Sequence, residues 1–391
     1  MQKRNFIICV LSAFLLSVSF IFASYKSNVF AFADTEISIE SKSCIMIEPI
    51  SNTVILSKNE NEKRPIASMC KIMTLLLIFE EIDKGNLALD SLISVSENAS
   101  SMGGSQVFLE ENGEYRADEL IKSIVVASAN DSCVAMAERL YGSEEIFVSK
   151  MNEKAKELKM TNTTFVNCTG LPKAGQFSCA KDVATMFKEL IGHEEYFTFS
   201  NVWMDKIQHP KDRITEISNT NKLIRFYEGC DSGKTGYTSE AGHCLCASAK
   251  RNDTRLISVV ISSPSSKDRF RDVSSMFNYG FANYTNKVLV DKNSQKYDTF
   301  EVLKGKKNNV TGAPKDSLFV FSKKNEEKVL EIKVNSLENL TAPINKGDVI
   351  GSVEVYENGI LIGKTEVVSI ENVEKATYFD YFNEVTENWA L

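Results

Sequence analysis

The chain has 391 residues, of which 43% are hydrophobic and 25% charged, with a formal net charge of −7. This length is sufficient for two domains, and the composition is that of a globular protein, which excludes a disordered or fibrous chain. The acidic balance, without a basic cluster that could follow a phosphate backbone, predicts no nucleic-acid partner.

The first 33 residues have the pattern of a secretory signal. Lys3 and Arg4 precede an apolar run from Phe6 to Ala23, and Ala31-Phe-Ala33 supplies small residues at the spacing of a cleavage site. We expect cleavage after Ala33, which would leave an exported, extracytoplasmic protein with a net charge of −10. The alternative is an uncleaved anchor, since the apolar run is close to the minimum length that spans a bilayer.

Cysteine use leaves the redox state open. Nine cysteines are present, and Cys9 lies in the expected signal. An even number in an exported chain indicates disulfides, whereas Cys133, Cys244 and Cys246 lie in apolar runs as small hydrophobic residues do. No C-x-x-C motif occurs, so we expect no zinc or other metal site.

The first elements lead to a candidate nucleophile. Residues 43–56 predict a β-hairpin of two buried strands. After a charged loop, Ser68 is expected to open an apolar helix that ends near Gly85, with Lys71 one turn further on. A hydroxyl and an amine side by side at a helix N-terminus could act as a serine nucleophile with a lysine base. A second match, Ser178-Cys-Ala-Lys181, makes this motif weak on its own.

Two helices separated by a polar triplet follow. Residues 100–105 predict a turn-rich loop of the kind that rims a cleft. Asp118 is expected to cap a helix over Glu119–Ala127, and a second helix is expected to begin after Asp131. The triplet between them, Ser128-Ala-Asn130, predicts either a loop pointing into a site or an ordinary helix cap; Ser96-Glu-Asn98 has the same pattern.

The middle of the chain continues with helices and then strands. We expect a helix over Glu144–Leu158 and another over Ala180–Ile191, which Ser178 would cap while Lys181 faces solvent. Residues 193–227 read as irregular and polar. Lys234-Thr-Gly236 is expected to start the edge strand of an antiparallel sheet, whose next strands cover 243–249 and 255–262, before a final helix over Val273–Tyr284.

Beyond Asn286 the pattern changes to short alternating segments, which predict a small all-β sandwich. The tail, residues 373–391, places Tyr378, Phe382, Val385 and Trp389 at helical spacing. This spacing indicates an amphipathic helix that either contacts the membrane surface or packs against the β domain. Lys375 is the only basic residue of the tail, which argues against binding to anionic lipids.

Three motifs occur in one order: Ser68-Met-Cys-Lys71, Ser128-Ala-Asn130 and Lys234-Thr-Gly236, the last of them once in the chain. With them, the sequence resembles the low-molecular-weight penicillin-binding proteins, the D-alanyl-D-alanine carboxypeptidases of peptidase family S11. The resemblance implies an α+β catalytic domain over 34–285, with an antiparallel sheet flanked by helices. A β-sandwich over 286–372 and a C-terminal amphipathic tail over 373–391 would follow.

The resemblance also implies roles for the motif residues. Ser68 would form an acyl-enzyme, and Lys71 would take its proton with a pKa lowered by burial and by the Lys234 cation. Ser128 would pass a proton to the departing D-alanine, and Asn130 would orient the substrate amide.

Further residues would bind the substrate. Lys234, Thr235 and Gly236 would lie along a strand that pairs with an extended peptide. The N–H groups of Ser68 and Tyr237 would form the oxyanion hole. Arg269 would hold the terminal carboxylate together with Thr235, although a surface arginine is the alternative.

The implied partners are the peptidoglycan stem peptide and β-lactam antibiotics as covalent inhibitors, with no cofactor. Cys70 and Ala129 replace the threonine and the glycine or aspartate that are commoner in the family. The alternatives are an endopeptidase on cross-linked peptidoglycan, a β-lactamase, and a non-catalytic cell-wall-binding protein. The last two are less favoured, because no Glu-x-x-Leu-Asn follows Ser128 and no catalytic motif residue is missing.

Overall fold

The computed structural model describes residues 37–389. The expected signal segment and residues 390–391 lie outside the described residues. Within 37–389 no helix is both long and apolar enough to cross a membrane. All eight cysteines of that range are buried free thiols, so the disulfides that their even number indicated do not form in this structure.

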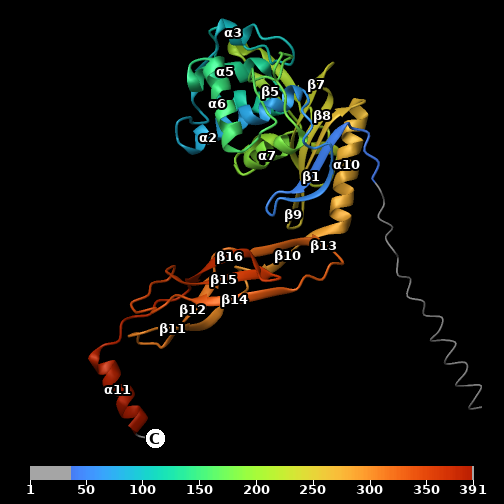
Figure 1. Ribbon diagram of the computed structural model, residues 1–391. Helices are drawn as coiled ribbons and strands as arrows, with labels where there is room; N and C mark the ends of the chain where they lie inside the picture. Colours follow the sequence, from blue (N-terminus) through green and yellow to red (C-terminus); the bar gives the residue numbers. More distant parts are fainter. Residues whose placement is uncertain (1–36, 390–391) are drawn as a thin grey trace, which may run out of the picture. The chain divides into compact units, whose positions relative to one another are not determined.

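A five-stranded antiparallel sheet organises the first part of the chain, in the order β2-β1-β9-β8-β7 (Figure 1). Its strands are β1 (Ser43–Glu48), β2 (Thr53–Lys58), β7 (Cys230–Thr238), β8 (Gly242–Arg251) and β9 (Thr254–Ser263). The expected edge strand at Lys234 is therefore confirmed as β7. The expectation of two buried strands in the first hairpin holds for β1 alone, because β2 is the opposite edge and leaves Val54 exposed.

Helices cover both faces of this sheet (Figure 1). On one face, α10 (Ser266–Asn283) packs on β8 and β9. On the other, α7 (Ala180–Leu190) packs on β1 and β9, and α2 (Lys71–Asp83) packs on α7. The helix α10 starts earlier than expected, because the Ser265 hydroxyl accepts a hydrogen bond from the Asp268 N–H and caps it. Arg269 thereby lies in its first turn.

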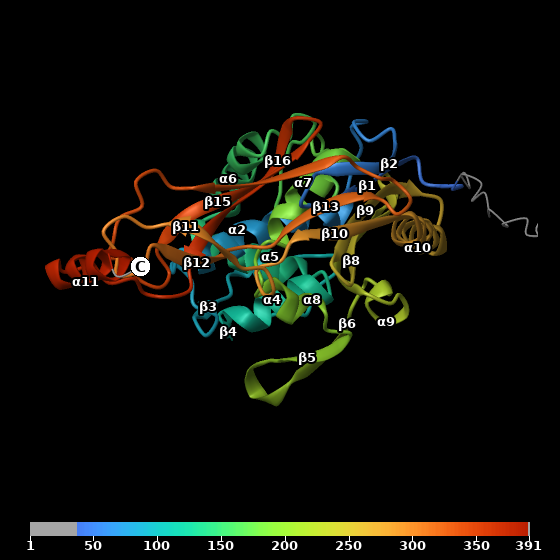
Figure 2. The same ribbon diagram turned by 90° about the horizontal axis from the view of Figure 1, so that it is seen from below.

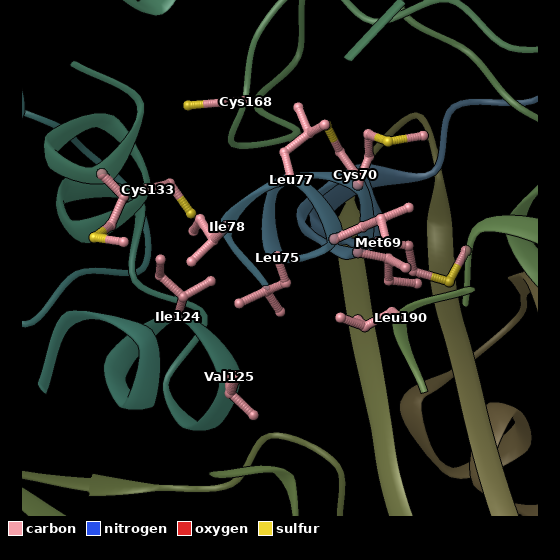
Figure 3. Close-up of a cluster of buried hydrophobic side chains, with 14 of the residues drawn as sticks. Met69, Cys70, Leu75, Leu77, Ile78, Ile124, Val125, Cys133, Cys168 and Leu190 are labelled. Carbon is pink, nitrogen blue, oxygen red and sulfur yellow. The ribbon is translucent and has the colours of Figure 1, made fainter. Parts of the chain in front are cut away.

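The central helix is α2, which is buried from Lys71 to Phe79. A helix that is apolar on all sides belongs inside a protein. Its neighbours are α4 (Ala117–Val126), α5 (Asn130–Tyr141) and α6 (Glu144–Glu157). Figure 3 shows its side chains between Ile124 and Val125 of α4, Cys133 of α5 and Leu190 of α7.

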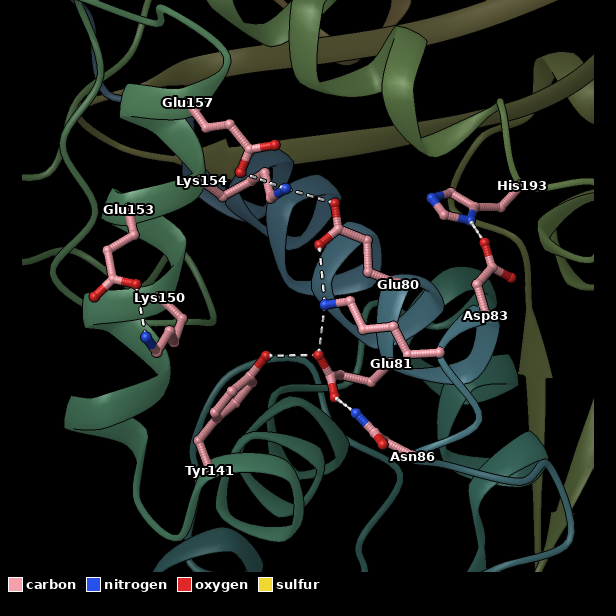
Figure 4. Close-up of polar contacts among 11 residues, drawn as sticks. Glu80, Glu81, Asp83, Asn86, Tyr141, Lys150, Glu153, Lys154, Glu157 and His193 are labelled. Carbon is pink, nitrogen blue, oxygen red and sulfur yellow. Dashed lines mark hydrogen bonds and ion pairs between the residues drawn. The ribbon is translucent and has the colours of Figure 1, made fainter.

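The C-terminal end of α2 is polar and is held by ion pairs (Figure 4). Glu80 binds Lys154 of α6 at 2.8 Å, and Glu81 binds Lys84 at 2.9 Å. The hydroxyl of Tyr141 donates to Glu81 at 3.1 Å. The C-terminal end of α2 is thus bound to α5 and α6 by polar contacts, while its N-terminal end is buried at the site described below.

Three helix starts differ from expectation. Asp118 lies in the first turn of α4 and does not cap it, and α5 begins at Asn130 itself. Cys179, not Ser178, caps α7, with its sulfur accepting from the Asp182 N–H. The Ser178 hydroxyl instead forms a 2.7 Å hydrogen bond with that of Thr163, so the second S-x-x-K match is structural. Lys181 is exposed, as expected.

Residues 193–227 contain more structure than their polar composition predicted. They form α8 (Tyr196–Ser200), a hairpin of β5 (Met204–Gln208) and β6 (Ile214–Ser218), and α9 (Leu223–Phe226), with the hairpin extending away from the helices in Figure 2. In the strands of this hairpin only Ile207 and Ile217 are buried, so the sequence lacks the apolar alternation that predicts strands. The remaining short elements before it are the 3₁₀ turn Ala67–Cys70, β3 (Leu92–Ser94), α3 (Glu97–Ser100) and β4 (Glu114–Arg116).

The all-β prediction for the later part of the chain is confirmed. Two strands pair in one sheet, β10 (Tyr284–Val290) and β13 (Leu318–Lys323). A five-stranded sheet has the order β11-β12-β16-β15-β14. Its strands are β11 (Tyr297–Glu301), β12 (Asn309–Pro314), β14 (Leu330–Ser336), β15 (Val349–Glu357) and β16 (Ile360–Ser369), and α11 (Tyr378–Trp389) follows. The strand β12 contains Gly312 and Pro314, which obscure its alternating pattern in the sequence.

Candidate active site

The two members of the first motif lie together at the start of α2. Ser68 is in the 3₁₀ turn Ala67–Cys70, one turn before the α-helix expected to contain it, and Lys71 is the first residue of that helix. The Lys71 Nζ lies 3.2 Å from the Ser68 Oγ. A base within hydrogen-bonding distance of a hydroxyl is the arrangement that activates a serine nucleophile.

Lys71 is fully buried, and burial is the main cause that lowers its pKa. Its Nζ donates to the Asn130 Oδ1 at 2.6 Å and to the Thr169 carbonyl at 2.5 Å. A neutral amine has two N–H groups, which these acceptors satisfy, and its lone pair then faces the Ser68 hydroxyl. Burial therefore favours the neutral form of Lys71, which can accept a proton, and the two acceptors hold the amine in place beside Ser68.

The second motif lies in a strained loop. Ser128 has a φ of 64°, a left-handed conformation that is costly for a residue with a side chain. Its Oγ accepts a 2.7 Å hydrogen bond from the Lys234 Nζ. Asn130 is anchored by its N–H to the Ser105 carbonyl and by its Nδ2 to that of Gly103, both at 2.7 Å. The loop interpretation of this motif therefore fits the structure better than a simple helix cap.

Lys234 brings a second buried amine into the site. Burial lowers its pKa well below the ordinary value, and the positive charge of Lys71 lowers it further. Electrostatic repulsion between two amines is mutual, so each disfavours protonation of the other. The expected influence of Lys234 on Lys71 is thus secondary to burial, which is the largest cause for both side chains.

Gly236 lets the edge strand pass close to Ser68. A Cβ at this position would lie 2.7 Å from the Ile66 carbonyl oxygen and 3.2 Å from the Ser68 backbone nitrogen. The next residue, Tyr237, is exposed and stacks on His243 with ring centroids 4.4 Å apart. A side chain at position 236 would therefore collide with the backbone of the turn that holds Ser68.

Arg269 is a cation without a carboxylate partner. Its guanidinium donates to the carbonyls of Gly236 and Cys244 at 3.1 and 3.4 Å, and its Nε is buried without a partner. It forms no ion pair with any acidic side chain in residues 37–389. A half-buried guanidinium beside β7, near the buried Thr235, is suited to an anionic ligand and is more than a surface arginine.

A loop over residues 167–171 contacts the start of α2, and this contact was not predicted from the sequence. Its carbonyl groups accept from three side chains at the start of α2: Asn167 from Cys70, Cys168 from Thr74 and Thr169 from Lys71. The Asn167 side chain holds the loop by accepting from the Gly170 N–H at 2.7 Å and donating to the Leu171 carbonyl. The departure at Cys70 therefore keeps a hydrogen-bond donor. The sequence predicts a loop here from residues that are ordinary in loops, but it does not predict that the loop carbonyls accept hydrogen bonds from α2.

The fold and this site define a serine-type peptidase. The chain belongs to the family described as D-alanyl-D-alanine carboxypeptidase, peptidase S11, whose model matches residues 30–265. Residues 284–375 match the C-terminal domain of penicillin-binding protein 5.

Individual relatives agree with the family match. The chain is 38% identical to D-alanyl-D-alanine carboxypeptidase DacF of Bacillus subtilis over 97% of its own length and 98% of that protein's. It is 33% identical to DacC of Escherichia coli over 88% and 86% of the two chains. The crystal structure of penicillin binding protein 5 from Haemophilus influenzae has a TM-score of 0.67 at 26% identity and covers 88% of this chain and all of that one.

Close packing at Gly170 leads to a testable prediction. This residue has a φ of +83°, and a Cβ here would lie 2.1 Å from the Ala67 carbonyl oxygen. Gly142 has a φ of +84° but has nothing within 4 Å of its Cβ position, so it provides a matched control. We expect Gly142→Ala to lower the free energy of unfolding by about 1 kcal/mol through backbone strain alone. Gly170→Ala should cost at least about 2 kcal/mol more, because the backbone before Ser68 must move.

Urea denaturation of the two variants measures this difference. Equal losses of unfolding free energy in the two variants would show that the loop at Gly170 is not tightly packed against the turn that holds Ser68.

Proposed function

We propose that this protein is a penicillin-sensitive, serine-type D-Ala-D-Ala carboxypeptidase. It removes the terminal D-alanine from the peptidoglycan pentapeptide through an acyl-enzyme on Ser68. The observation that carries the proposal is the fully buried Lys71, whose Nζ lies 3.2 Å from the Ser68 Oγ while Asn130 and Thr169 occupy its N–H groups. The names of the relatives support the substrate class.

In the first chemical step, neutral Lys71 accepts the proton of Ser68, and the Ser68 Oγ attacks the carbonyl of the penultimate D-alanine. The N–H groups of Ser68 and Tyr237 stabilise the negative oxygen that forms. The C–N bond then breaks, and Ser128, whose hydroxyl is held by Lys234, passes a proton to the departing amine and regains one from the protonated Lys71. Water hydrolyses the ester of Ser68 and releases the shortened peptide.

Substrate orientation follows from β7 and Arg269. An extended peptide can pair with the free edge of β7, with Gly236 allowing its approach to Ser68. Arg269 and Thr235 would bind the C-terminal carboxylate of a pentapeptide. β-lactam antibiotics, which act as covalent inhibitors, would place their own carboxylate at the same position. Lys234 and Asn130 complete the walls of the site.

This carboxylate site favours the carboxypeptidase over the endopeptidase alternative, because a free terminal carboxylate matches the unpaired Arg269. A relative named D-alanyl-D-alanine endopeptidase, from Escherichia coli, is 29% identical over 68% of this chain. A β-lactamase or a non-catalytic cell-wall-binding protein has no observation in its favour.

Replacement of the nucleophile provides the decisive test. Ser68→Ala should reduce D-alanine release from a pentapeptide by at least about a thousandfold and abolish covalent labelling by fluorescent penicillin, since the Lys71 Nζ contacts no other hydroxyl among the described residues. The matched control is Ser178→Ala in the second S-x-x-K match, whose hydroxyl contacts Thr163. It should keep both activities once its folding is confirmed.

Labelling that persists in Ser68→Ala would contradict the assignment of the nucleophile. Labelling by the wild-type protein without D-alanine release would contradict the carboxypeptidase activity.

The charge of Lys234 should influence the pH dependence of acylation. Lys71 acts as a base only when neutral, so the acid limb of the acylation rate follows its pKa. Lys234→Met removes a neighbouring positive charge, which makes protonation of Lys71 easier and raises its pKa. The acid limb should therefore move to higher pH, while Lys234→Arg, which keeps the charge, should move it less.

Stopped-flow acylation by a chromogenic cephalosporin across pH measures the position of this limb independently of its height. A limb that stays in place in Lys234→Met would disprove the electrostatic link.

We further propose that the protein works outside the cytoplasm and contacts the membrane surface through α11. Four aromatic side chains of this helix are exposed to 45% or more: Tyr378, Phe379, Tyr381 and Phe382. Their exposure argues against the alternative of packing on the β domain. The only basic residue of the tail is Lys375, so apolar burial and not charge would drive binding.

Sedimentation with phosphatidylcholine vesicles tests this contact. Serine replacements of Tyr378, Phe379 and Phe382 together should weaken binding about tenfold or more. Val329→Ser, at another exposed apolar residue, is the control. Equal binding of the two variants would rule out α11 as the contact.

A further inference from the structure

Two adjoining hollows open beside Ser68. The inner hollow is small and is lined by residues next to the nucleophile and at the end of β7, among them Ala67, Gly170, Leu171 and Thr238. The outer hollow has a volume of about 450 Å³ and reaches Lys63, Arg64 and Phe177. They share walls formed by Pro65, Pro172, Lys173, Gln176 and Glu240, so they form one continuous path away from Ser68.

The direction of this path rests on the proposed function. If Thr235 and Arg269 bind the terminal carboxylate and Ser68 attacks the next carbonyl, the acyl part of the peptide continues toward Thr238. Past Thr238 the chain turns at Glu240, which lines both hollows. Residues upstream of the scissile bond therefore reach the outer hollow.

The outer hollow is lined by three basic side chains, Lys63, Arg64 and Lys173. The Lys63 Nζ lies 4.8 Å from the ring centroid of Phe177, and the closest polar contact of the Lys173 Nζ is the Val166 carbonyl at 3.5 Å. Neither lysine forms an ion pair with an acidic residue of the described part of the chain. Arg64 pairs with Glu62 at 2.6 Å, yet its Nε is buried without a hydrogen-bond partner.

Such a cluster is unusual in this chain, whose net charge is −7. Like charges in one hollow repel each other unless a negative group joins them, and a concave surface concentrates their field. Glu240 is the only acid among the residues lining either hollow, and it lies where the two meet. A negative ligand group is therefore repelled at the junction and attracted at the outer end.

We propose that the outer hollow binds a carboxylate carried by the acyl part of the peptide substrate, upstream of the scissile bond. Lys63 and Lys173 receive this carboxylate, and the ring of Phe177 supports the apolar stem of the side chain that bears it. The hollow thus makes the enzyme selective for acidic donor peptides, at a distance from the reacting bond. Glu240 keeps the negative group away from the inner hollow.

The experiment compares two matched donor peptides that end in D-Ala-D-Ala and differ by glutamate or glutamine at the third residue from the C-terminus. A second pair carries the same exchange at the fourth residue. The measured quantity is the ratio of kcat/KM for D-alanine release, acidic donor over neutral donor. For the wild-type protein we expect a ratio of about three to ten in one of the two pairs, falling toward one between about 0.02 M and about 0.5 M salt.

Variants locate the effect. Lys63→Ala and Lys173→Ala should each lower the ratio by about two- to five-fold, whereas Glu240→Gln should raise it, since a repelling charge is removed. Lys250→Ala is the matched control, because Lys250 is an exposed lysine at the far end of β8 that lines neither hollow. Its ratio should equal that of the wild-type protein.

The outcomes separate this inference from the proposed function. A wild-type ratio near one in both pairs, with D-alanine still released, overturns the carboxylate site and leaves the peptidase activity standing. Equal effects of Lys250→Ala and Lys173→Ala, or a fall of the ratio in Glu240→Gln, also overturn it. Failure to release D-alanine from any donor contradicts the proposed function instead.

Discussion

The structure depends on burying the amine of Lys71 beside the hydroxyl of Ser68. An isolated ammonium inside a protein is costly, and the usual response is a lowered pKa. Burial is what lowers the pKa of Lys71, whereas the Asn130 Oδ1 and the Thr169 carbonyl fix the position of the amine beside Ser68 by accepting its N–H groups. The central position of α2, with its buried face from Lys71 to Phe79, is what keeps water away from this amine.

The geometry around this amine is maintained by backbone segments that approach the nucleophile from two sides. Gly236 of β7 and Gly170 of the supporting loop both bring their chains against the turn that holds Ser68. On a third side, Ser128 adopts a left-handed conformation that places its hydroxyl against Lys234. Strained or side-chain-free backbone at three points is consistent with a site in which small displacements matter.

The ionisable side chains at the site are basic. Lys71, Lys234 and Arg269 are basic side chains partly or fully removed from water, and none of them forms an ion pair with a carboxylate of the described residues. Two of them repel each other, which helps to keep one neutral as a base, and the third remains available to an anionic substrate group. On the path that we propose for the acyl part of a bound peptide, Lys63 and Lys173 add further positive charge at the outer hollow.

The sequence by itself determined the class of the fold and most of the motif residues. Ser68 and Lys71 are three residues apart, so local helical geometry alone brings them together. The order of the three motifs, the apolar continuity of α2 and the alternation beyond Asn286 predicted the architecture. Local signals failed where tertiary contacts decide, as in the β5–β6 hairpin, the cap of α7 by Cys179, and β12.

The order of the three motifs had already favoured Ser68 over Ser178, and only the tertiary structure decided the environment that separates the two S-x-x-K matches. Ser178 and Lys181 have the same spacing as Ser68 and Lys71, but Ser178 is bonded to Thr163 and Lys181 points to solvent. The contributions of Thr169 and Gly170 were also invisible, because a carbonyl group and an absent side chain carry no chemical signature in a sequence. Their effect arises from contacts between segments about a hundred residues apart, which no local pattern encodes.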